Sequence, residues 1–229
     1  MSTVVKIGGA LLENAAKAVA AIQRAGTAQT VIVHGGGIQI TRMLERMKVA
    51  SVFIEGLRVT DAETLADVAM AVLGQVHTAL VAELRQKGLP AVGMFGLVRA
   101  SHKAGQWGLV GTDLRADAAA LNAMLAAGRL PVIPTLAVGE TSLLNVNGDE
   151  TAAAVAVALA CNELVFLTDV EGVKDADGVV LDHVATADEL LPASFVTGGM
   201  IPKLRAVKAA MDGGVRAVRV GRTQFGSIS

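Results

Sequence analysis

Short apolar runs alternate along the chain with longer segments in which apolar residues recur at helical spacing. Short runs with few polar interruptions are typical of strands that are buried on both faces of a sheet. Six such runs are expected to be strands: Val4–Ile7, Thr30–His34, Ala91–Met94, Val132–Thr135, Leu164–Thr168 and Val215–Val220. Because the segments between them have helical periodicity, the strands are expected to pair in parallel through right-handed crossovers, which predicts a layered α/β fold.

Three segments have the clearest helical spacing. After three consecutive glycines, apolar residues fall at i, i+3, i+4 and i+7 from Ile40, which makes one apolar face. The longest helix is expected within residues 61–87, with Thr60–Glu63 as its start signal. A third helix is expected from Lys203 onward and should end at the pair of glycines that begins at Gly213.

The remaining segments indicate hairpins within a single domain. Residues 99–111 mix glycine with polar residues, and Asp175–Gly178 is a turn signal between two apolar stretches. No low-complexity linker interrupts the chain. We therefore expect one domain over residues 1–229, in which an N-terminal lobe (1–160) and a C-terminal lobe (161–229) meet at a packed junction.

The composition narrows the classes of protein to which the chain can belong. Its 229 residues are 52% hydrophobic, and its formal net charge of −1 lacks the basic excess of a nucleic-acid-binding surface. We recognise no secretory signal, and no apolar run is expected to approach the ~20 residues that span a bilayer. The single cysteine, Cys161, lies in an apolar stretch and is interpreted as a buried small hydrophobe, in keeping with a cytoplasmic location.

Two glycine-rich segments follow predicted strands, and they are Lys6-Ile7-Gly8-Gly9 and His34-Gly35-Gly36-Gly37. Ligands of open α/β sheets bind at the carboxyl ends of the strands, where glycine N–H groups before a helix can bind an anion. Three consecutive glycines are entropically costly, which favours close approach of a ligand over a simple tight turn. Neither segment matches the dinucleotide fingerprint or the P-loop. His34 itself is expected to be structural rather than catalytic.

Charged and amide side chains elsewhere would complete an anion site. Lys6 ends a strand, and Lys203 lies at a helix start, where the macrodipole disfavours a cation, so we infer a functional role for both. Arg58 has the planar fork that suits a carboxylate, and Asn145 can hold a substrate through its amide. Asp149 has two open interpretations, because it can cap the helix that follows or hold the two lysines apart.

The segment from Thr168 to Val173 ends a predicted strand with an acidic residue and a glycine. It can bind the ribose and base of a nucleotide, and the alternative is an ordinary turn at the end of a strand. Phosphoryl transfer needs positioning and positive potential more than covalent chemistry from the protein. Taken together, these segments indicate a site for phosphoryl transfer.

Five motifs occur in a characteristic order: Val-Lys-Ile-Gly-Gly, Val-Ile-Val-His-Gly-Gly-Gly, Gly-Leu-Arg-Val-Thr-Asp, Asn-Val-Asn-Gly-Asp and Gly-Met-Ile-Pro-Lys. In these motifs, and over nearly its whole length, the chain resembles the amino acid kinase family. The resemblance implies a three-layer αβα sandwich with a mostly parallel sheet of about eight strands. Within the family, Gly-Leu-Arg-Val-Thr points to members that phosphorylate the side-chain carboxylate of N-acetyl-L-glutamate in arginine biosynthesis, rather than to carbamate, uridylate or aspartate kinases.

The resemblance also implies a role for each matching residue. Catalysis would fall to Lys6 and Lys203, which stabilise the transferring phosphoryl group and the leaving phosphate, and to Asp149, which organises them. The acylated amino acid would bind in the N-terminal lobe, to Gly8, Gly9, Gly36, Gly37, Arg58 and Asn145. ATP would bind in the C-terminal lobe, to Asp169, Glu171, Gly172, Val173, Phe195, Thr197 and Met200. Mg²⁺ would be held mainly by the phosphates of ATP, with few or no ligands from the protein.

Some segments depart from the family pattern, and two alternative functions stay open. Family members continue beyond the position at which this chain ends, so an outer element of the nucleotide lobe is expected to be missing or shortened, and the hairpin around residues 94–107 is short. The chain begins at its first strand, whereas arginine-regulated relatives carry an extra N-terminal helix, so we expect a homodimer without arginine feedback. From the charge and the apolar runs we expect no nucleic-acid or membrane partners. The alternatives are a kinase for carrier-protein-bound α-aminoadipate or glutamate and, more remotely, a catalytically silent amino-acid sensor.

Overall fold

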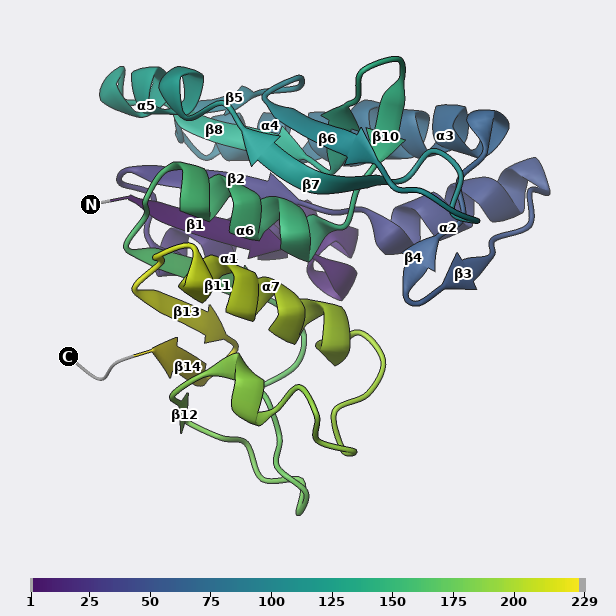
Figure 1. Ribbon diagram of the computed structural model, residues 1–229. Coiled ribbons are helices and arrows are strands. Elements are labelled where there is room, and N and C mark those ends of the chain that lie inside the picture. The colour runs from purple at the N-terminus through teal and green to yellow at the C-terminus, as the bar shows by residue number, and fades with distance from the viewer. Residues whose placement is uncertain (1, 227–229) are drawn as a thin grey trace.

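An eight-stranded sheet forms the centre of the computed structural model, which describes residues 2–226 (Figure 1). From edge to edge its strands are β12 (His183–Val184), β14 (Thr223–Gly226), β13 (Ala217–Val220), β11 (Glu163–Leu167), β1 (Thr3–Ile7), β2 (Thr30–His34), β8 (Leu130–Pro134) and β5 (Ala91–Gly93). Every neighbouring pair is parallel except β13 and β14. All six predicted strands and the mostly parallel sheet are confirmed.

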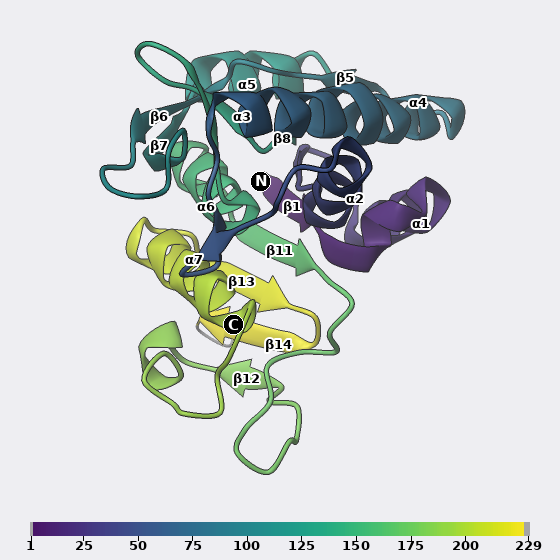
Figure 2. The same cartoon turned by 90° about the vertical axis from the view of Figure 1, so that its right-hand side faces the viewer.

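Helices cover both faces of this sheet (Figure 2). One face packs against α1 (Ala15–Ala25) and α4 (Thr78–Gln86), and the other against α6 (Gly148–Ala158) and α7 (Met200–Asp212). The predicted three-layer architecture is therefore confirmed. The last helix begins at Met200, so Lys203 lies within its first turn and not at its first residue.

Alternation along the buried strands assigns each side chain to one face. Val5, Ile7 and Ile32 join the core beneath α1 and α4, whereas Val4 and Val33 join the core beneath α6 and α7. The strands are in register, so the side chains of neighbouring residues across β1 and β2 emerge from the same face of the sheet. This register sets the relation between the glycine segments that follow the two strands.

A smaller sheet and a short hairpin lie beside the carboxyl ends of the main strands. The smaller sheet contains β10 (Leu143–Asn145), β9 (Leu136–Val138), β6 (Val98–His102) and β7 (Gly111–Ala116), and the hairpin contains β3 (Phe53–Ile54) and β4 (Leu57–Arg58). The antiparallel pair of β6 and β7 confirms the predicted hairpin over residues 99–111. The turn at Asp175–Gly178 is also confirmed, because the N–H of Asp175 donates to the carbonyl of Val179 and an antiparallel bridge joins Lys174 to Val180.

The remaining elements are helical. They are η1 (a 3-10 turn, Gly9–Glu13), α2 (Gly37–Met47), α3 (Ala62–Ala69), η2 (Met70–His77), α5 (Ala118–Ala126) and η3 (a 3-10 turn, Ala187–Glu189). The segment η2 is π-helical and joins α3 to α4, so residues 62–86 form one continuous helix. The predicted helices after Ile40 and over 61–87 are therefore confirmed.

The long helix corrects one expectation from the sequence. We expected no apolar run of membrane-spanning length, but the helix Ala62–Gln86 has 25 residues and contains an 18-residue window with a mean hydropathy of 1.5, enough to cross a membrane by length and composition. In the fold, Leu80 and Leu84 pack into the core beside the main sheet, and Val68 and Val72 pack against α2. Packing against the rest of the domain accounts for these apolar side chains.

Candidate active site

Three charged side chains from distant parts of the chain meet beyond the carboxyl ends of the central strands. Lys6 Nζ lies 2.6 Å from Asp149 Oδ1, and Lys203 Nζ lies 3.1 Å from Asp149 Oδ2. All three side chains are nearly buried. Each carboxylate oxygen thus pairs with a different lysine, so the carboxylate both separates and orients the two ammonium groups.

The electrostatics of this group depend on burial and on the mutual pairing. Burial raises the pKa of the Asp149 carboxyl, but Lys6 and Lys203 outweigh that effect and hold the pKa below its usual value. Burial lowers the pKa of Lys203, and Asp149 opposes that shift. Lys203 Nζ also lies 4.9 Å from the centroid of the Phe166 ring, which favours the charged form of the amine. Two lysines on one aspartate leave a net positive charge, which suits a phosphate.

Backbone features explain how Lys6 and Asp149 come together. Asn147 is the N-cap of α6, because its side chain accepts from the N–H groups of Asp149 and Glu150. Of the two interpretations of Asp149, the cap is therefore wrong, and its carboxylate is free to bind the lysines. A Cβ at Gly8 would lie 2.5 Å from Lys6 Nζ, so only glycine leaves room for the lysine as it is placed.

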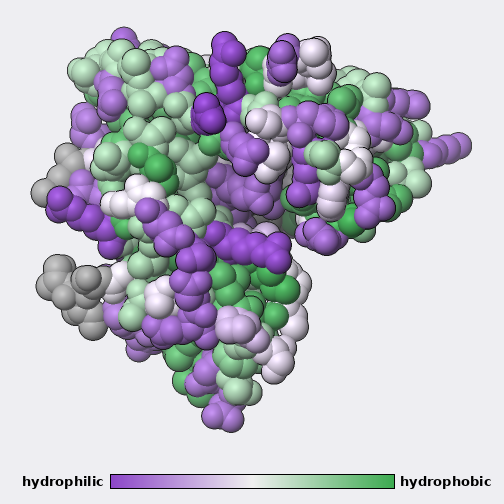
Figure 3. Space-filling model, viewed as in Figure 1, coloured by the Kyte–Doolittle hydropathy of each residue, from purple (hydrophilic) through white to green (hydrophobic). Residues whose placement is uncertain are grey.

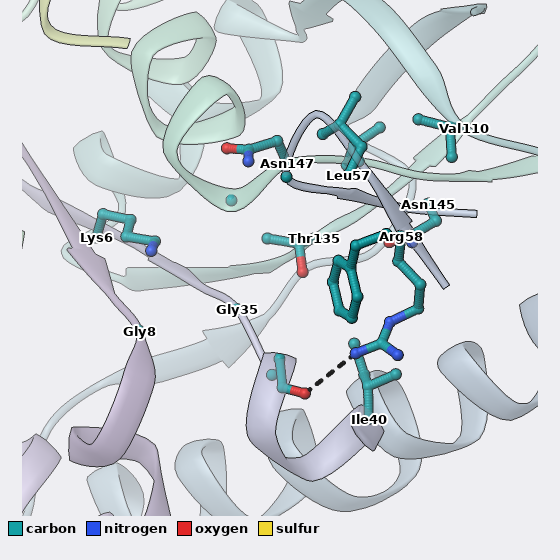
Figure 4. A pocket seen from close by; sticks show the side chains of 16 residues that line it. Lys6, Gly8, Gly35, Ile40, Leu57, Arg58, Val110, Thr135, Asn145 and Asn147 are labelled. Carbon is teal, nitrogen blue, oxygen red and sulfur yellow. Dashed lines mark hydrogen bonds between the residues drawn. The ribbon is translucent and has the colours of Figure 1, made fainter. Parts of the chain in front are cut away.

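Lys6 also lines a cavity of about 250 Å³ on the side of α2 (Figure 4). Its walls contain the glycines at the start of α2, the β3–β4 hairpin and the segment that leads into α6, contributed by Gly8, Gly35, Gly36, Gly37, Ile40, Phe53, Gly56, Leu57, Arg58, Val110, Thr135, Asn145, Val146, Asn147 and Gly148. We call it the acceptor cavity. In Figure 4, Lys6 and Arg58 lie on opposite sides of it.

Arg58 is held rigidly at the far end of the acceptor cavity. Its guanidinium donates to Thr41 Oγ1 at 2.9 Å, to Ser51 Oγ and to the carbonyl of Gly37, and it lies 4.6 Å from the centroid of the Phe53 ring. Arg58 is 6% exposed, and burial lowers its pKa. Within residues 2–226 no carboxylate forms a salt bridge with it. A buried guanidinium of this kind suits the carboxylate of a ligand.

Asn145 is linked to Arg58 through Thr60. The Asn145 side chain donates to Thr60 Oγ1 at 3.0 Å, and the Thr60 hydroxyl donates to the Arg58 carbonyl at 2.8 Å. Thr60 is completely buried. The two predicted acceptor-binding side chains are thus fixed relative to each other, although 86 positions separate them in the sequence, from 58 to 145 with both ends excluded.

A second cavity, of about 400 Å³, lies on the side of α7, and we call it the nucleotide cavity. It shares Lys6 and Gly8 with the acceptor cavity and is further lined by Leu167, Thr168, Asp169, Val170, Thr197, Gly199, Met200 and Lys203. The space-filling view shows a hollow between the upper part of the molecule and the part that carries α7 (Figure 3). Lys6 therefore stands between two cavities, with Lys203 on the second.

The family model for the amino acid kinase family matches residues 1–222. The chain belongs to the amino acid kinase family. It is 42% identical to the acetylglutamate kinase of Acidobacterium capsulatum, over 96% of this chain and 90% of that protein, and 39% identical to the acetylglutamate kinase of Koribacter versatilis over the same shares. The crystal structure of smu.665 from Streptococcus mutans UA159 has a TM-score of 0.85 and 30% identity and covers 99% of this chain and 98% of that one.

Most of the residues singled out from the sequence of this amino acid kinase line one of the two cavities. Gly8, Gly36, Gly37, Arg58 and Asn145 line the acceptor cavity. Gly9 is the first residue of η1, and its relation to the cavity lies outside what the structure describes. The roles of all these residues toward a substrate stay predictions.

The expected nucleotide-binding residues divide into two groups. Asp169, Thr197 and Met200 line the nucleotide cavity, whereas Glu171, Gly172, Val173 and Phe195 do not. Val173 is buried in the main core, and its N–H already donates to Thr223 Oγ1, so it is not free to donate to a ligand. Gly172 packs so closely that an added Cβ would lie 2.6 Å from that hydroxyl oxygen. Asp169 and the residues that follow it therefore differ in position, and the binding role of each stays a prediction.

Several residues that shape the site were not predicted from the sequence. The sequence Asn147-Gly-Asp-Glu carries an N-cap signal that would have assigned the cap to Asn147. Thr41, Ser51 and Phe53 hold Arg58, but nothing in the local sequence reveals those contacts because they arise from the packing of α2 on the β3–β4 hairpin. Cys161 was interpreted correctly, because it is buried and burial raises the pKa of its thiol to about 11.

Proposed function

We propose that this amino acid kinase transfers the γ-phosphoryl group of ATP to the side-chain carboxylate of N-acetyl-L-glutamate and so makes N-acetyl-L-glutamyl 5-phosphate for arginine biosynthesis. The observation that carries the proposal is the Lys6–Asp149–Lys203 group, which lies between two cavities. Two relatives called acetylglutamate kinase, at 42% and 39% identity over nearly the whole chain, support the choice of acceptor.

The proposed reaction needs no general base, because the attacking group is already a carboxylate. The acceptor carboxylate attacks the γ-phosphorus, and the bond to the bridging oxygen of ADP breaks. Negative charge then moves toward the leaving β-phosphate. Lys6 touches both cavities and can follow the transferring group, whereas Lys203 lies only on the nucleotide cavity and can neutralise the leaving phosphate.

Arg58 and Asn145 are proposed to bind the other end of the acceptor. The α-carboxylate would pair with the Arg58 fork, and the acetamido group would bind the Asn145 amide. If the α-carboxylate binds Arg58, the rest of the ligand can reach across the cavity toward Lys6 on the opposite side (Figure 4). The volume of about 250 Å³ suits a small free amino-acid derivative, and this favours acetylglutamate over a carrier-bound acceptor.

Mg²⁺ is proposed to accompany ATP and to be held mainly by its phosphates, where it would neutralise charge between the β- and γ-phosphates. Among the described lining residues of the two cavities the one acidic side chain is Asp169, on the nucleotide cavity, and both oxygens of the nearby Asp149 already pair with lysines. Within residues 2–226 no group of three or more histidine, cysteine or acidic side chains is placed to hold a metal ion. The donor set therefore fits a metal that arrives with the nucleotide.

The proposed division into lobes follows the two cavities. The acceptor cavity is lined by residues up to Gly148, whereas the nucleotide cavity takes all its lining residues except Lys6 and Gly8 from Leu167 onward. We also propose a cytoplasmic homodimer. The dimer is supported by β5, which is an edge strand, and by Met70 on the neighbouring long helix, which is 50% exposed.

The direct test is ADP release from Mg²⁺-ATP with N-acetyl-L-glutamate as acceptor. Hydroxylamine added to the same reaction should trap the acyl phosphate as a hydroxamate. Glutamate, aspartate and N-acetyl-α-aminoadipate serve as competing acceptors and should react much more slowly. No hydroxamate from N-acetyl-L-glutamate, with a faster reaction of another acceptor, would contradict the proposed function.

A further inference from the structure

A pair of histidines lies beside the three glycines at the start of α2. His34 Nε2 lies 2.8 Å from His77 Nδ1, and His34 Nδ1 lies 2.9 Å from the carbonyl oxygen of Gly35. His34 is completely buried, and His77 is half-buried. Neither histidine lines the acceptor or the nucleotide cavity.

These contacts determine which ring nitrogens carry hydrogen. A carbonyl oxygen can only accept, so His34 Nδ1 donates to Gly35. Burial lowers the pKa of His34 to about 4, so the ring is neutral near pH 7 and its Nε2 accepts. His77 therefore donates through Nδ1. The result is a directed chain of hydrogen bonds from His77 to His34 and from His34 to the Gly35 carbonyl.

The direction of the Gly35 carbonyl sets the direction of the next N–H. In a trans peptide the C=O and N–H groups point in opposite directions. His34 is in register with Ile7, whose side chain faces the α1 and α4 layer, whereas Lys6 emerges from the opposite face, toward α6. Because His34 holds the Gly35 carbonyl toward its own layer, the N–H of Gly36 is directed to the side of Lys6.

The N–H of Gly36 is available to a ligand there. Gly36 lines the acceptor cavity, and it precedes α2 as its N-cap. In the part of the chain that the structure describes, no group accepts a hydrogen bond from this N–H. The cavity also contains Lys6, so an anion held by the lysine would lie on the side to which the N–H points.

We propose that His34 and His77 are positioning residues that hold the Gly36 N–H toward the anion that reacts in the acceptor cavity. The identity of that anion, the acceptor carboxylate or the transferring phosphoryl group, rests on the proposed function. The histidines act through the peptide and do not touch the reacting atoms. A fixed donor stabilises developing charge better than one that must first reorient.

The π-helical segment and Gly93 place His77 against His34. In an α-helix, 100° per residue would set His77 about 140° around the axis from Val72. The wider turn of η2 returns both residues to one side, where Val72 packs near Gly36 and His77 meets His34. A Cβ at Gly93 would lie in contact with His77 Nε2, so glycine on β5 leaves the space for the ring.

The first test compares two substitutions of His77. Asparagine carries an N–H donor near the position of Nδ1, whereas leucine has a similar shape and no donor. His77→Leu should lower kcat about tenfold, less than the ~10²–10³-fold loss expected when a whole donor is removed. His77→Asn should recover most of kcat, and KM for both substrates should change less than about twofold in either variant.

A matched control separates positioning from stability. Leu80→Val alters a residue of α4 that lies three positions beyond His77 and packs into the core, and it leaves both histidines in place. It should lower the melting temperature and leave kcat unchanged. Unchanged kcat in His77→Leu, or an equal loss of kcat in Leu80→Val, would overturn the inference.

A second variant and an NMR spectrum test the same chain of hydrogen bonds without removing a histidine. Gly93→Ala forces His77 to shift and should lower kcat by about as much as His77→Leu. The double variant with both substitutions should have a kcat no lower than that of either single variant. Long-range ¹⁵N–¹H spectra of the intact protein should show His34 protonated at Nδ1 and unprotonated at Nε2. His34 protonated at Nε2 would overturn the inference.

The outcomes also separate the inference from the proposed function. If the native protein fails to phosphorylate N-acetyl-L-glutamate, the proposed function is wrong, and the ¹⁵N spectrum still decides whether the histidine chain exists. If the native protein is active and His77→Leu keeps its kcat, the proposed function stands and the positioning role is wrong.

Discussion

Lys203 Nζ lies 3.1 Å from Asp149 Oδ2, although the two residues differ by 54 in sequence number. Asp149 belongs to the second position of α6 and Lys203 to the first turn of α7, and these two helices cover the same face of the sheet. The pair sets a cation at the border of the nucleotide cavity. Its contribution should therefore be largest when charge develops on the leaving phosphate.

Lys203→Ala should lower kcat by about 10²–10³-fold and change KM for ATP far less, because the charge stabilises the transition state more than the bound substrate. Steady-state kinetics with varied ATP measure both constants. Lys208→Ala is the matched control, since Lys208 lies on the same helix and pairs with the exposed Asp188 and Asp212. A rise in KM alone for Lys203→Ala would contradict the catalytic role.

Arg58→Lys should raise KM for the acceptor on the order of tenfold and leave KM for ATP unchanged, because the substitution keeps a charge but loses the planar fork. Titration of each substrate at saturating concentrations of the other gives the two constants. Arg46→Lys, an exposed position on α2, should change neither. The assignment of the acceptor end fails if acceptor affinity is the same in Arg58→Lys as in the native protein.

Gly8→Ala should displace Lys6, because the added Cβ would lie 2.5 Å from the lysine Nζ. The backbone of Gly8 is extended, at φ −148°, so alanine fits the chain itself without strain. We expect kcat to fall by about 10²-fold, the scale of an error of about 1 Å in placing a reacting group. Thermal unfolding should change little, and a large loss of stability with normal kcat would contradict this explanation.

Stability should fall as the pH drops from 7 to 5, partly because of His34. Its pKa is about 4 in the folded protein and 6.5 as the ordinary value, so the unfolded chain binds more protons in this interval. The free energy of unfolding should decrease by about 2 kcal/mol from this residue, at 1.36 kcal/mol per pKa unit. Urea unfolding at several pH values should show a shallower slope for His34→Asn, and an unchanged slope would contradict the assignment.

The sequence predicted the parts of the fold and site that depend on short-range signals. Apolar runs located the central strands, and glycines beside Lys6 and His34 located the edge where the cavities lie. Contacts between residues distant in the sequence could not be predicted from such local signals. The pairing of His34 with His77 requires a π-helical turn that no local propensity indicates, and Val173 follows a plausible loop signal yet turns into the core.

The placement of β1 has a consequence for how the chain acquires activity. Thr3 pairs with Thr30 on one side but with Glu163 on the other, so the second neighbour of the first strand leaves the ribosome about 160 residues later. Such distant pairing slows folding. Lys6 gains its complete surroundings only after β11 has been synthesised, so a chain that stops before that strand leaves one edge of β1 unpaired and open to pairing with another chain.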